Sequence, residues 1–243
     1  MSEIRILPAG EQLMQAAADM VAQLAKQAII KRGRFSLVLS GGSTPRALYQ
    51  LLATSPYHDE IEWANVHVFW GDERCVPPDD AESNYRTARE SLLDQVAIPP
   101  TNIHRICGEL SPEDAAKDYA QTLMSFFGAG IPQFDLVLLG MGDDGHTASL
   151  FPHTAALDET QEWVVANHVP QKDVWRITLT LPVINAARQV MFLVAGAPKA
   201  KRLREVLYGP RQPLDLPAQS VQPTNGNLLW LVDAAAASAL PHT

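Results

Sequence analysis

A histidine in a glycine-rich segment is the side chain of this sequence best suited to proton transfer. His146 follows the residues GMGDDG at positions 140–145, which come directly after the apolar run at 134–139. Imidazole changes its charge near neutral pH, and a neighbouring carboxylate can orient the ring or raise its basicity. Asp143 and Asp144 are both candidates for that carboxylate, and both could instead cap the turn that follows. The segment therefore predicts a general acid–base group and leaves its carboxylate partner open.

A glycine turn that suits a phosphate group follows another apolar run, at 35–40. The turn contains Gly41, Gly42, Ser43 and Thr44. Glycines let the backbone approach a ligand closely, and the two hydroxyl groups add hydrogen-bond donors. The spacing is neither that of a Walker A loop nor that of GxGxxG, so no nucleotide is implied. A tight turn that caps a helix explains the same residues about equally well.

Charged residues follow a third apolar run, at 66–70. Asp72 and Arg74 are two of these residues, and the Arg74 guanidinium can bind a carboxylate, a phosphate or a developing oxyanion. A salt-bridged surface turn is the alternative for these residues.

Lys199 begins a predicted helix, where the helix dipole disfavours a cation unless an anion is bound. Arg176, which opens a predicted strand, could join the same site or form a structural ion pair.

The elements that must position these residues alternate between strands and helices. Near-continuous apolar runs predict strands at 35–40, 66–70, 134–139, 163–166, 175–180, 189–195 and 228–232. Helical periodicity and capping residues predict helices at 11–31, 82–94, 111–127, 182–188 and 198–208, and one more in which Thr44 is the N-cap and Pro45 the first residue. This alternation predicts an α/β fold, a Rossmann-like and mostly parallel sheet with helices on both faces. We expect residues 1–243 to form a single α/β domain, with 209–223 as a surface loop.

Composition limits the classes of partner. The chain has 243 residues, of which 47% are hydrophobic and 19% charged, which excludes intrinsic disorder. With 19 Lys and Arg against 27 Asp and Glu the net charge is −8, which disfavours nucleic-acid binding. No apolar run is long enough for a membrane span and no signal peptide is evident, so we expect a cytoplasmic protein without a membrane partner. Cys75 and Cys107 lack metal-ligand spacing and are expected to be buried, reduced thiols.

Four stretches of the chain, taken together, resemble the 6-phosphogluconolactonase family of sugar-phosphate hydrolases. They lie at 40–49, 69–85, 138–152 and 176–200, in the order and spacing of that family. A sister family, the glucosamine-6-phosphate deaminases, shares the glycine turn and the Asp-Gly-His sequence. It is expected to carry DEY where this chain has DER at 72–74, and an acidic segment where this chain has SLFP at 149–152. Both differences favour the lactonase.

The resemblance implies hydrolysis of 6-phospho-D-glucono-1,5-lactone to 6-phosphogluconate, the second step of the oxidative pentose phosphate pathway. It also implies a fold of the deaminase, ribose-phosphate isomerase and CoA-transferase type. No metal or organic cofactor is required in that family. The expected partner is a small sugar-phosphate lactone, and the chain is expected to be a monomer or a small homo-oligomer.

Lactone hydrolysis needs a base for water, stabilisation of the oxyanion and a proton for the leaving oxygen, and these roles fall on the segments already described. We expect His146 to be the base, with Arg74 holding the substrate or stabilising the oxyanion. The backbone N–H groups of Gly140 and Gly142 are expected to help at the oxyanion. Asp144 is expected to orient His146 and Asp72 to orient Arg74, or both bind sugar hydroxyls. The residues expected at the phosphate are Gly41, Gly42, Ser43, Thr44, Lys199 and Arg176.

Three alternatives remain at this point. A nucleophilic serine is disfavoured because Ser40, Ser43 and Ser149 lie outside any GxSxG sequence. An amino-sugar-phosphate isomerase or deaminase would need an acidic group in place of Leu150 or Phe151. A non-catalytic sugar-phosphate sensor would need a DNA-binding module, and only about ten residues precede the first predicted helix.

Overall fold

A six-stranded parallel sheet forms the centre of the molecule. The computed structural model describes residues 2–241. The strand order is β1-β9-β8-β5-β2-β3, and every neighbouring pair is parallel. The strands are β1 (Ser2–Leu7), β2 (Phe35–Leu39), β3 (Val66–Trp70), β5 (Leu136–Leu139), β8 (Gln189–Val194) and β9 (Asn227–Asp233). Strands β2, β5 and β8 are buried along their whole length, which explains their continuous apolar sequence.

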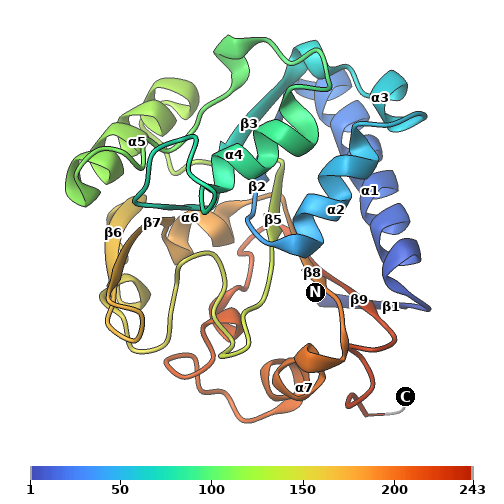
Figure 1. The fold of residues 1–243 in the computed structure, drawn as a ribbon, viewed down its shortest axis with the longest axis vertical. Coiled ribbons are helices and arrows are strands. Elements are labelled where there is room, and N and C mark those ends of the chain that lie inside the picture. Colours follow the sequence, from blue (N-terminus) through green and yellow to red (C-terminus); the bar gives the residue numbers. More distant parts are fainter. Residues whose placement is uncertain (1, 242–243) are drawn as a thin grey trace.

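A second, antiparallel sheet lies beside the first. It has the order β4-β7-β6, with β4 (Asp72–Arg74), β6 (Val164–Val169) and β7 (Val174–Leu179). Figure 1 shows β6 and β7 as a hairpin at the left edge of the molecule. The chain enters β4 through Gly71, directly after β3 ends at Trp70. This short connection brings the second sheet to the carboxyl end of the first.

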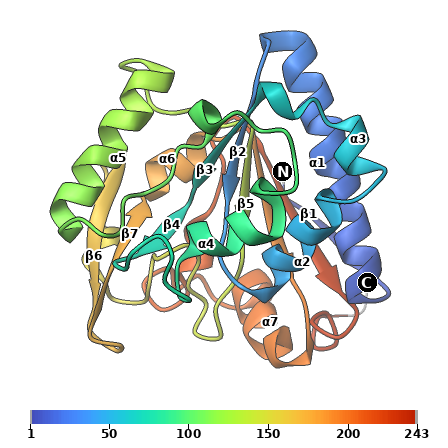
Figure 2. The ribbon, with the colours of Figure 1, turned by 45° about the horizontal axis from the view of Figure 1, so that its top comes forward.

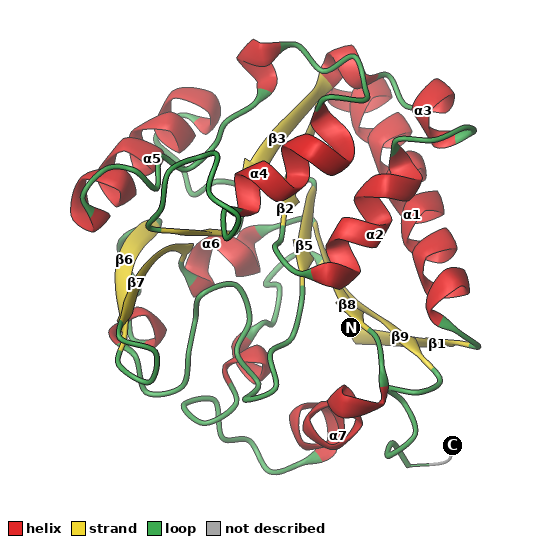
Figure 3. Ribbon diagram, in the orientation of Figure 1, coloured by secondary structure: helices red, strands yellow, loops and turns green. Residues whose placement is uncertain are grey.

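Helices lie on both sides of the parallel sheet. They are α1 (Gly10–Arg32), α2 (Ser43–Leu52), α3 (Tyr57–Glu60), α4 (Asn84–Ala88), α5 (Pro112–Phe127), α6 (Leu181–Ala186) and α7 (Ala200–Tyr208). In Figure 1, α1, α2 and α3 lie together at the right, α5 and α6 lie at the left near β6 and β7, and α7 lies at the bottom. Figure 2 shows α5 beside β6 and β7. Figure 3 distinguishes helices, strands and loops by colour. The α/β architecture with a mostly parallel sheet is confirmed.

Several local predictions differ from the structure. Strands β1 and β4 were not predicted, because β1 is a partly exposed edge strand and β4 has only three residues, all charged. The predicted helix at 82–94 is α4 followed by a π-helical turn at Arg89–Leu93. Helix α2 begins at Ser43, and its N-cap is Gly42 with φ of 106°, so Thr44 is not the cap.

The segment at 209–223 is more than a surface loop. Leu216, Ala218 and Val221 are buried, and Pro217–Ser220 forms a turn of 3₁₀ helix. The Ala218 N–H donates to the carbonyl of Gly145 at 3.0 Å, so this segment packs against the turn that carries the histidine. Prolines at 210, 213, 217 and 223 give the segment a loop-like composition, which hides its buried contacts.

Two expectations from composition are also addressed by the structure. Cys75 and Cys107 are free cysteines, and both are partly rather than fully buried. Across residues 2–241, no helix has the length and apolar character needed to cross a membrane.

Candidate active site

The three predicted polar segments meet because they follow neighbouring parallel strands. The carboxyl ends of β8, β5, β2 and β3 lie at one edge of the sheet, where ligands of open α/β sheets usually bind. A cavity of about 500 Å³ opens there. It is lined by Ser40, Gly41, Gly42, Asp72, Arg74, Asn84, Gly140, Met141, Gly142, Asp143, Asp144, His146, Thr147, Ala148, Ser149, Phe151, Lys172, Arg176 and Lys199.

A tight turn after β5 presents His146 to this cavity. The Gly142 N–H donates to the carbonyl of His146 at 2.8 Å, and the Gly145 N–H donates to the carbonyl of Gly142 at 3.1 Å. A Cβ atom on Gly142 would lie 2.1 Å from the imidazole, so this position accepts only glycine without a shift of the ring. Because its N–H is bound within the turn, Gly142 does not supply the oxyanion donor that we expected of it.

Asp144 is the carboxylate that holds the histidine. Its Oδ1 lies 2.5 Å from Nδ1 of His146 and accepts the backbone N–H of the same residue at 3.0 Å. Burial acts to raise the pKa of Asp144, but the hydrogen bonds and charge of His146 outweigh it and lower that pKa to about 2. An ionised Asp144 keeps the proton of His146 on Nδ1, which leaves the lone pair on Nε2.

Asp143 has a different partner. Its Oδ1 lies 2.6 Å from Nζ of Lys199, and this contact lowers the pKa of Asp143. Its backbone carbonyl accepts a hydrogen bond from Nε of Arg202 at 2.9 Å. Lys199 therefore lines the cavity, as its sequence position indicated, but it is already paired with a carboxylate.

Asp72 is buried at the cavity wall and does not orient Arg74, contrary to one of our two expectations for it. Its Oδ2 accepts from the Ser149 hydroxyl at 2.6 Å, and its Oδ1 lies 3.4 Å from the amide nitrogen of Asn84. Arg74 instead donates to the backbone carbonyl of Glu82. Asp72 is held by neutral donors, which leaves it available to accept from a sugar hydroxyl.

Glu73, the residue between Asp72 and Arg74, is a structural carboxylate, and the alternative of a salt-bridged surface turn is wrong for it. The side chain is only 2% exposed. Its two oxygens accept from the backbone N–H groups of Arg74, Asn84 and Tyr85 and from the Ser83 hydroxyl. Burial raises the pKa of Glu73, although these hydrogen bonds oppose the rise. The residue fixes the start of α4 beside the cavity.

Two guanidinium groups form a cationic wall on the second sheet. Arg74 and Arg176 are directly opposite each other in the β4–β7 ladder, and both line the cavity. Burial, followed by the charge of Arg74, lowers the pKa of Arg176. Neither arginine makes an ion pair with any residue that the structure describes. Two adjacent unpaired cations form a strong site for an anion.

The glycine turn contributes only its first part to the cavity. Ser40, Gly41 and Gly42 line it, whereas Ser43 and Thr44 lie outside the lining. A Cβ atom on Gly41 would lie 2.0 Å from the amide oxygen of Asn84, so a larger residue here would displace the Asn84 side chain. The other residue expected to supply backbone donors, Gly140, lines the cavity, and its carbonyl accepts the Thr147 hydroxyl at 2.8 Å.

Several residues of the cavity lining have no role in the site expected from the sequence. Asn84, Ser149, Phe151 and Lys172 line the cavity, and only the first three fall within segments that we had compared with a family. Phe151 stacks on the His146 ring with centroids 4.0 Å apart. No group of three or more potential metal ligands occurs among residues 2–241.

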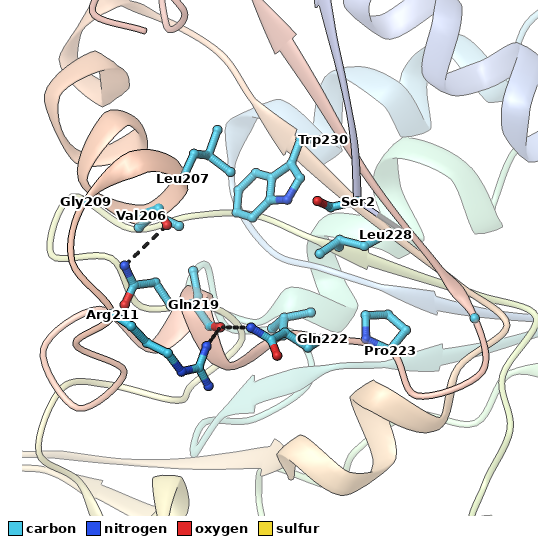
Figure 4. A pocket seen from close by; sticks show the side chains of 13 residues that line it. Ser2, Val206, Leu207, Gly209, Arg211, Gln219, Gln222, Pro223, Leu228 and Trp230 are labelled. Carbon is cyan, nitrogen blue, oxygen red and sulfur yellow. Dashed lines mark hydrogen bonds between the residues drawn. The ribbon is translucent and has the colours of Figure 1, made fainter. Parts of the chain in front are cut away.

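A second cavity, of about 420 Å³, lies between β9, α7 and the segment at 209–223 (Figure 4). Trp230 and Leu228 line one side of it, and Gln219 and Arg211 line another. The Gln219 amide donates to the carbonyl of Val206 at 3.3 Å, which ties the segment to α7. The predicted site residues are not part of this lining.

The fold and the polar cavity around His146 define an α/β protein whose candidate site combines a histidine–carboxylate pair with several cationic side chains. The chain belongs to the family of glucosamine-6-phosphate isomerases and 6-phosphogluconolactonases, whose model matches residues 8–230. It is 43% identical over 241 residues to a 6-phosphogluconolactonase from a Nostoc species, covering 98% of both chains. It is 44% identical over 232 residues to one from a Synechocystis species, covering 94% of each. The structure of a 6-phosphogluconolactonase from Trypanosoma brucei matches with a TM-score of 0.87 and 30% identity, covering 99% of both chains.

Proposed function

We propose that this protein hydrolyses 6-phospho-D-glucono-1,5-lactone to 6-phosphogluconate in the oxidative pentose phosphate pathway. The observation that carries the proposal is the Asp144–His146 pair, which faces the same cavity as the unpaired Arg74 and Arg176. Relatives at 43–44% identity bear the name of this activity. The alternative isomerase or deaminase reaction is not favoured, because the buried, apolar Leu150 and Phe151 stand where that reaction needs an acidic group.

In this mechanism His146 is the general base. Its Nε2 removes a proton from water, and the hydroxide formed attacks C1 of the lactone to give a tetrahedral oxyanion. The C1–O5 bond then breaks, and His146 returns the proton to the leaving ring oxygen. Asp144 holds the ring and stabilises the imidazolium during this cycle. The carboxylic acid formed at C1 ionises at neutral pH.

The phosphate group belongs on the cationic side of the cavity. Arg176 supplies an unpaired charge, and the Gly41–Gly42 backbone allows close approach. Lys199 joins them while remaining near Asp143. Arg74, next to Arg176, holds the substrate or stabilises the oxyanion. A cavity built around these cations should reject unphosphorylated gluconolactone, because losing the phosphate leaves them without a partner.

The decisive measurement is the loss of freshly generated 6-phosphogluconolactone, compared with its spontaneous opening. We expect strong acceleration by the parent protein, and a fall of roughly 10²- to 10⁴-fold in kcat for His146→Ala. His58→Ala is the matched control, because His58 is exposed on α3 and does not line the cavity. Full activity of His146→Ala would remove His146 as the base. No acceleration by folded parent protein would reject the lactonase, and glucosamine 6-phosphate would then be tested.

The remaining properties are proposals from sequence and family. We propose that residues 1–243 act as one catalytic domain in the cytoplasm, as a monomer or small homo-oligomer that does not bind nucleic acid.

A further inference from the structure

The charges around the cavity are unevenly paired. Four cationic side chains line it, namely Arg74, Lys172, Arg176 and Lys199. Lys199 is bound to Asp143, whereas the other three make no ion pair with any of residues 2–241. The proposed function uses Arg74 and Arg176, which are neighbours in one ladder. It leaves Lys172 without a role.

Lys172 reaches the cavity on the side of the catalytic base. Its Nζ lies over the Phe151 ring, 4.9 Å from the centroid, and the same ring stacks on His146 at 4.0 Å. Phe151 is itself buried, with 5% of its surface exposed. The ammonium group and the imidazole that activates water therefore both contact Phe151, in the wall of the same cavity.

The turn between β6 and β7 fixes the backbone at Lys172, whose side chain is exposed. The Lys172 N–H donates to the carbonyl of Val169 at 3.0 Å, and the Gln171 amide donates to the carbonyl of Pro152 at 3.2 Å. Asp173 has φ of 49°, an uncommon left-handed conformation that completes the four-residue turn. The turn is thus tied to the segment that carries Phe151.

The reaction creates negative charge at C1, where His146 acts. The ester carbonyl is neutral, the tetrahedral intermediate carries an oxyanion, and the product carries a carboxylate. Gly142 cannot stabilise this charge through its N–H, because that group is bound to His146. We propose that Lys172 is a cation that binds the oxygen atoms of C1 as they become charged, and that it recognises the carboxylate of the product. This inference rests on the proposed function.

Two ligands that differ only at C1 test this role without turnover. 6-Phosphogluconate has a carboxylate there, and D-glucitol 6-phosphate has a hydroxymethyl group. We expect Lys172→Met to weaken calorimetric binding of 6-phosphogluconate by about 10-fold, because it removes a charge-assisted contact, and to change binding of D-glucitol 6-phosphate less than twofold. Lys172→Arg should restore most of the difference. In the lactone assay, Lys172→Met should lower kcat rather than raise KM.

Lys26→Met is the matched control, because it removes the same charge from an exposed position on α1. Equal weakening of both ligands by Lys172→Met would overturn the proposal and place Lys172 at the phosphate. Unchanged binding of both would identify Lys172 as a solvated surface residue, which also overturns it. Absence of lactone turnover by the parent protein would count against the proposed function, while the two-ligand comparison would still decide the role of Lys172.

Discussion

At the scale of single residues, the choice of carboxylate next to His146 is the feature with the clearest chemical consequence. Asp143 and Asp144 are adjacent in sequence, yet one pairs with Lys199 and the other with the imidazole. The low pKa of Asp144, about 2, means that it is ionised throughout the physiological range. The negative charge of the Asp144 carboxylate, next to Nδ1 of His146, favours the tautomer with a free Nε2 and stabilises the imidazolium that forms during catalysis.

We therefore predict that Asp144→Asn lowers kcat by about 10²-fold with a small effect on KM. The asparagine fills the same volume but is neutral, and it can present its amide donor to Nδ1 and so favour the wrong tautomer. Steady-state kinetics on freshly prepared lactone measure both constants.

Asp143→Asn is the matched control for that variant. Asp143 is 83% exposed, and its loss breaks only the pair with Lys199. We expect kcat to stay within about threefold of the parent value, because an exposed ion pair contributes little. An equal fall in kcat for both variants would contradict the assignment of Asp144 as the partner of the base.

At the scale of elements, Glu73 determines how α4 begins at the rim of the cavity. Three backbone N–H groups and the Ser83 hydroxyl depend on this one buried carboxylate. We predict that Glu73→Ala lowers the free energy of unfolding by about 3 kcal/mol, because buried donors lose their acceptor. Glu73→Gln, which keeps one carbonyl oxygen, should lose less. Urea denaturation measures both changes.

The neighbouring Glu82→Gln is the control for this prediction. Glu82 is exposed and contacts Arg74 through its backbone carbonyl, which the substitution preserves. The Glu82→Gln variant should have the same free energy of unfolding as the parent protein.

Glu73→Gln should also raise KM, because Asn84 lines the cavity. An unchanged KM together with an unchanged free energy of unfolding would show that Glu73 does not anchor α4.

The elements also show which features the sequence predicts well. Helix α5 and strand β2 depend on local signals, a Ser-Pro start in one and a five-residue apolar run in the other, and both were predicted to within two residues. Strand β4 has no local signal, because its three charged residues become a strand only by pairing with β7. The same limit applies to the site. Placement at strand ends was predictable, but the partner of Asp72 and the role of Lys172 depend on contacts between distant segments.

At the scale of the whole molecule, a pair of half-buried histidines outside the lining of the active-site cavity is expected to couple stability to pH. Nδ1 of His67 lies 3.2 Å from Nε2 of His104, and the His104 ring stacks on Phe69 at 4.4 Å. Burial, followed by the charge of His67, lowers the pKa of His104 to about 4, and burial also lowers the pKa of His67. These rings belong to an aromatic cluster with Phe126, so protonation would place charge in an apolar setting.

This pair predicts a loss of stability in mild acid. An unfolded histidine takes up a proton near pH 6.5, whereas folded His104 does so only near pH 4, so the unfolded state binds more protons between these values. The contribution of neutral His104 to the free energy of unfolding is therefore fully present above pH 6.5 and is lost as the pH falls toward 4. After solvent screening this contribution is of the order of 1 kcal/mol.

Urea midpoints at pH 7 and pH 5 measure this loss. His104→Phe keeps a ring but cannot be protonated, so its urea midpoint should drop less between the two pH values than that of the parent protein. The exposed His58→Gln should drop as much as the parent. Equal drops in all three proteins would show that this half-buried pair does not control acid stability.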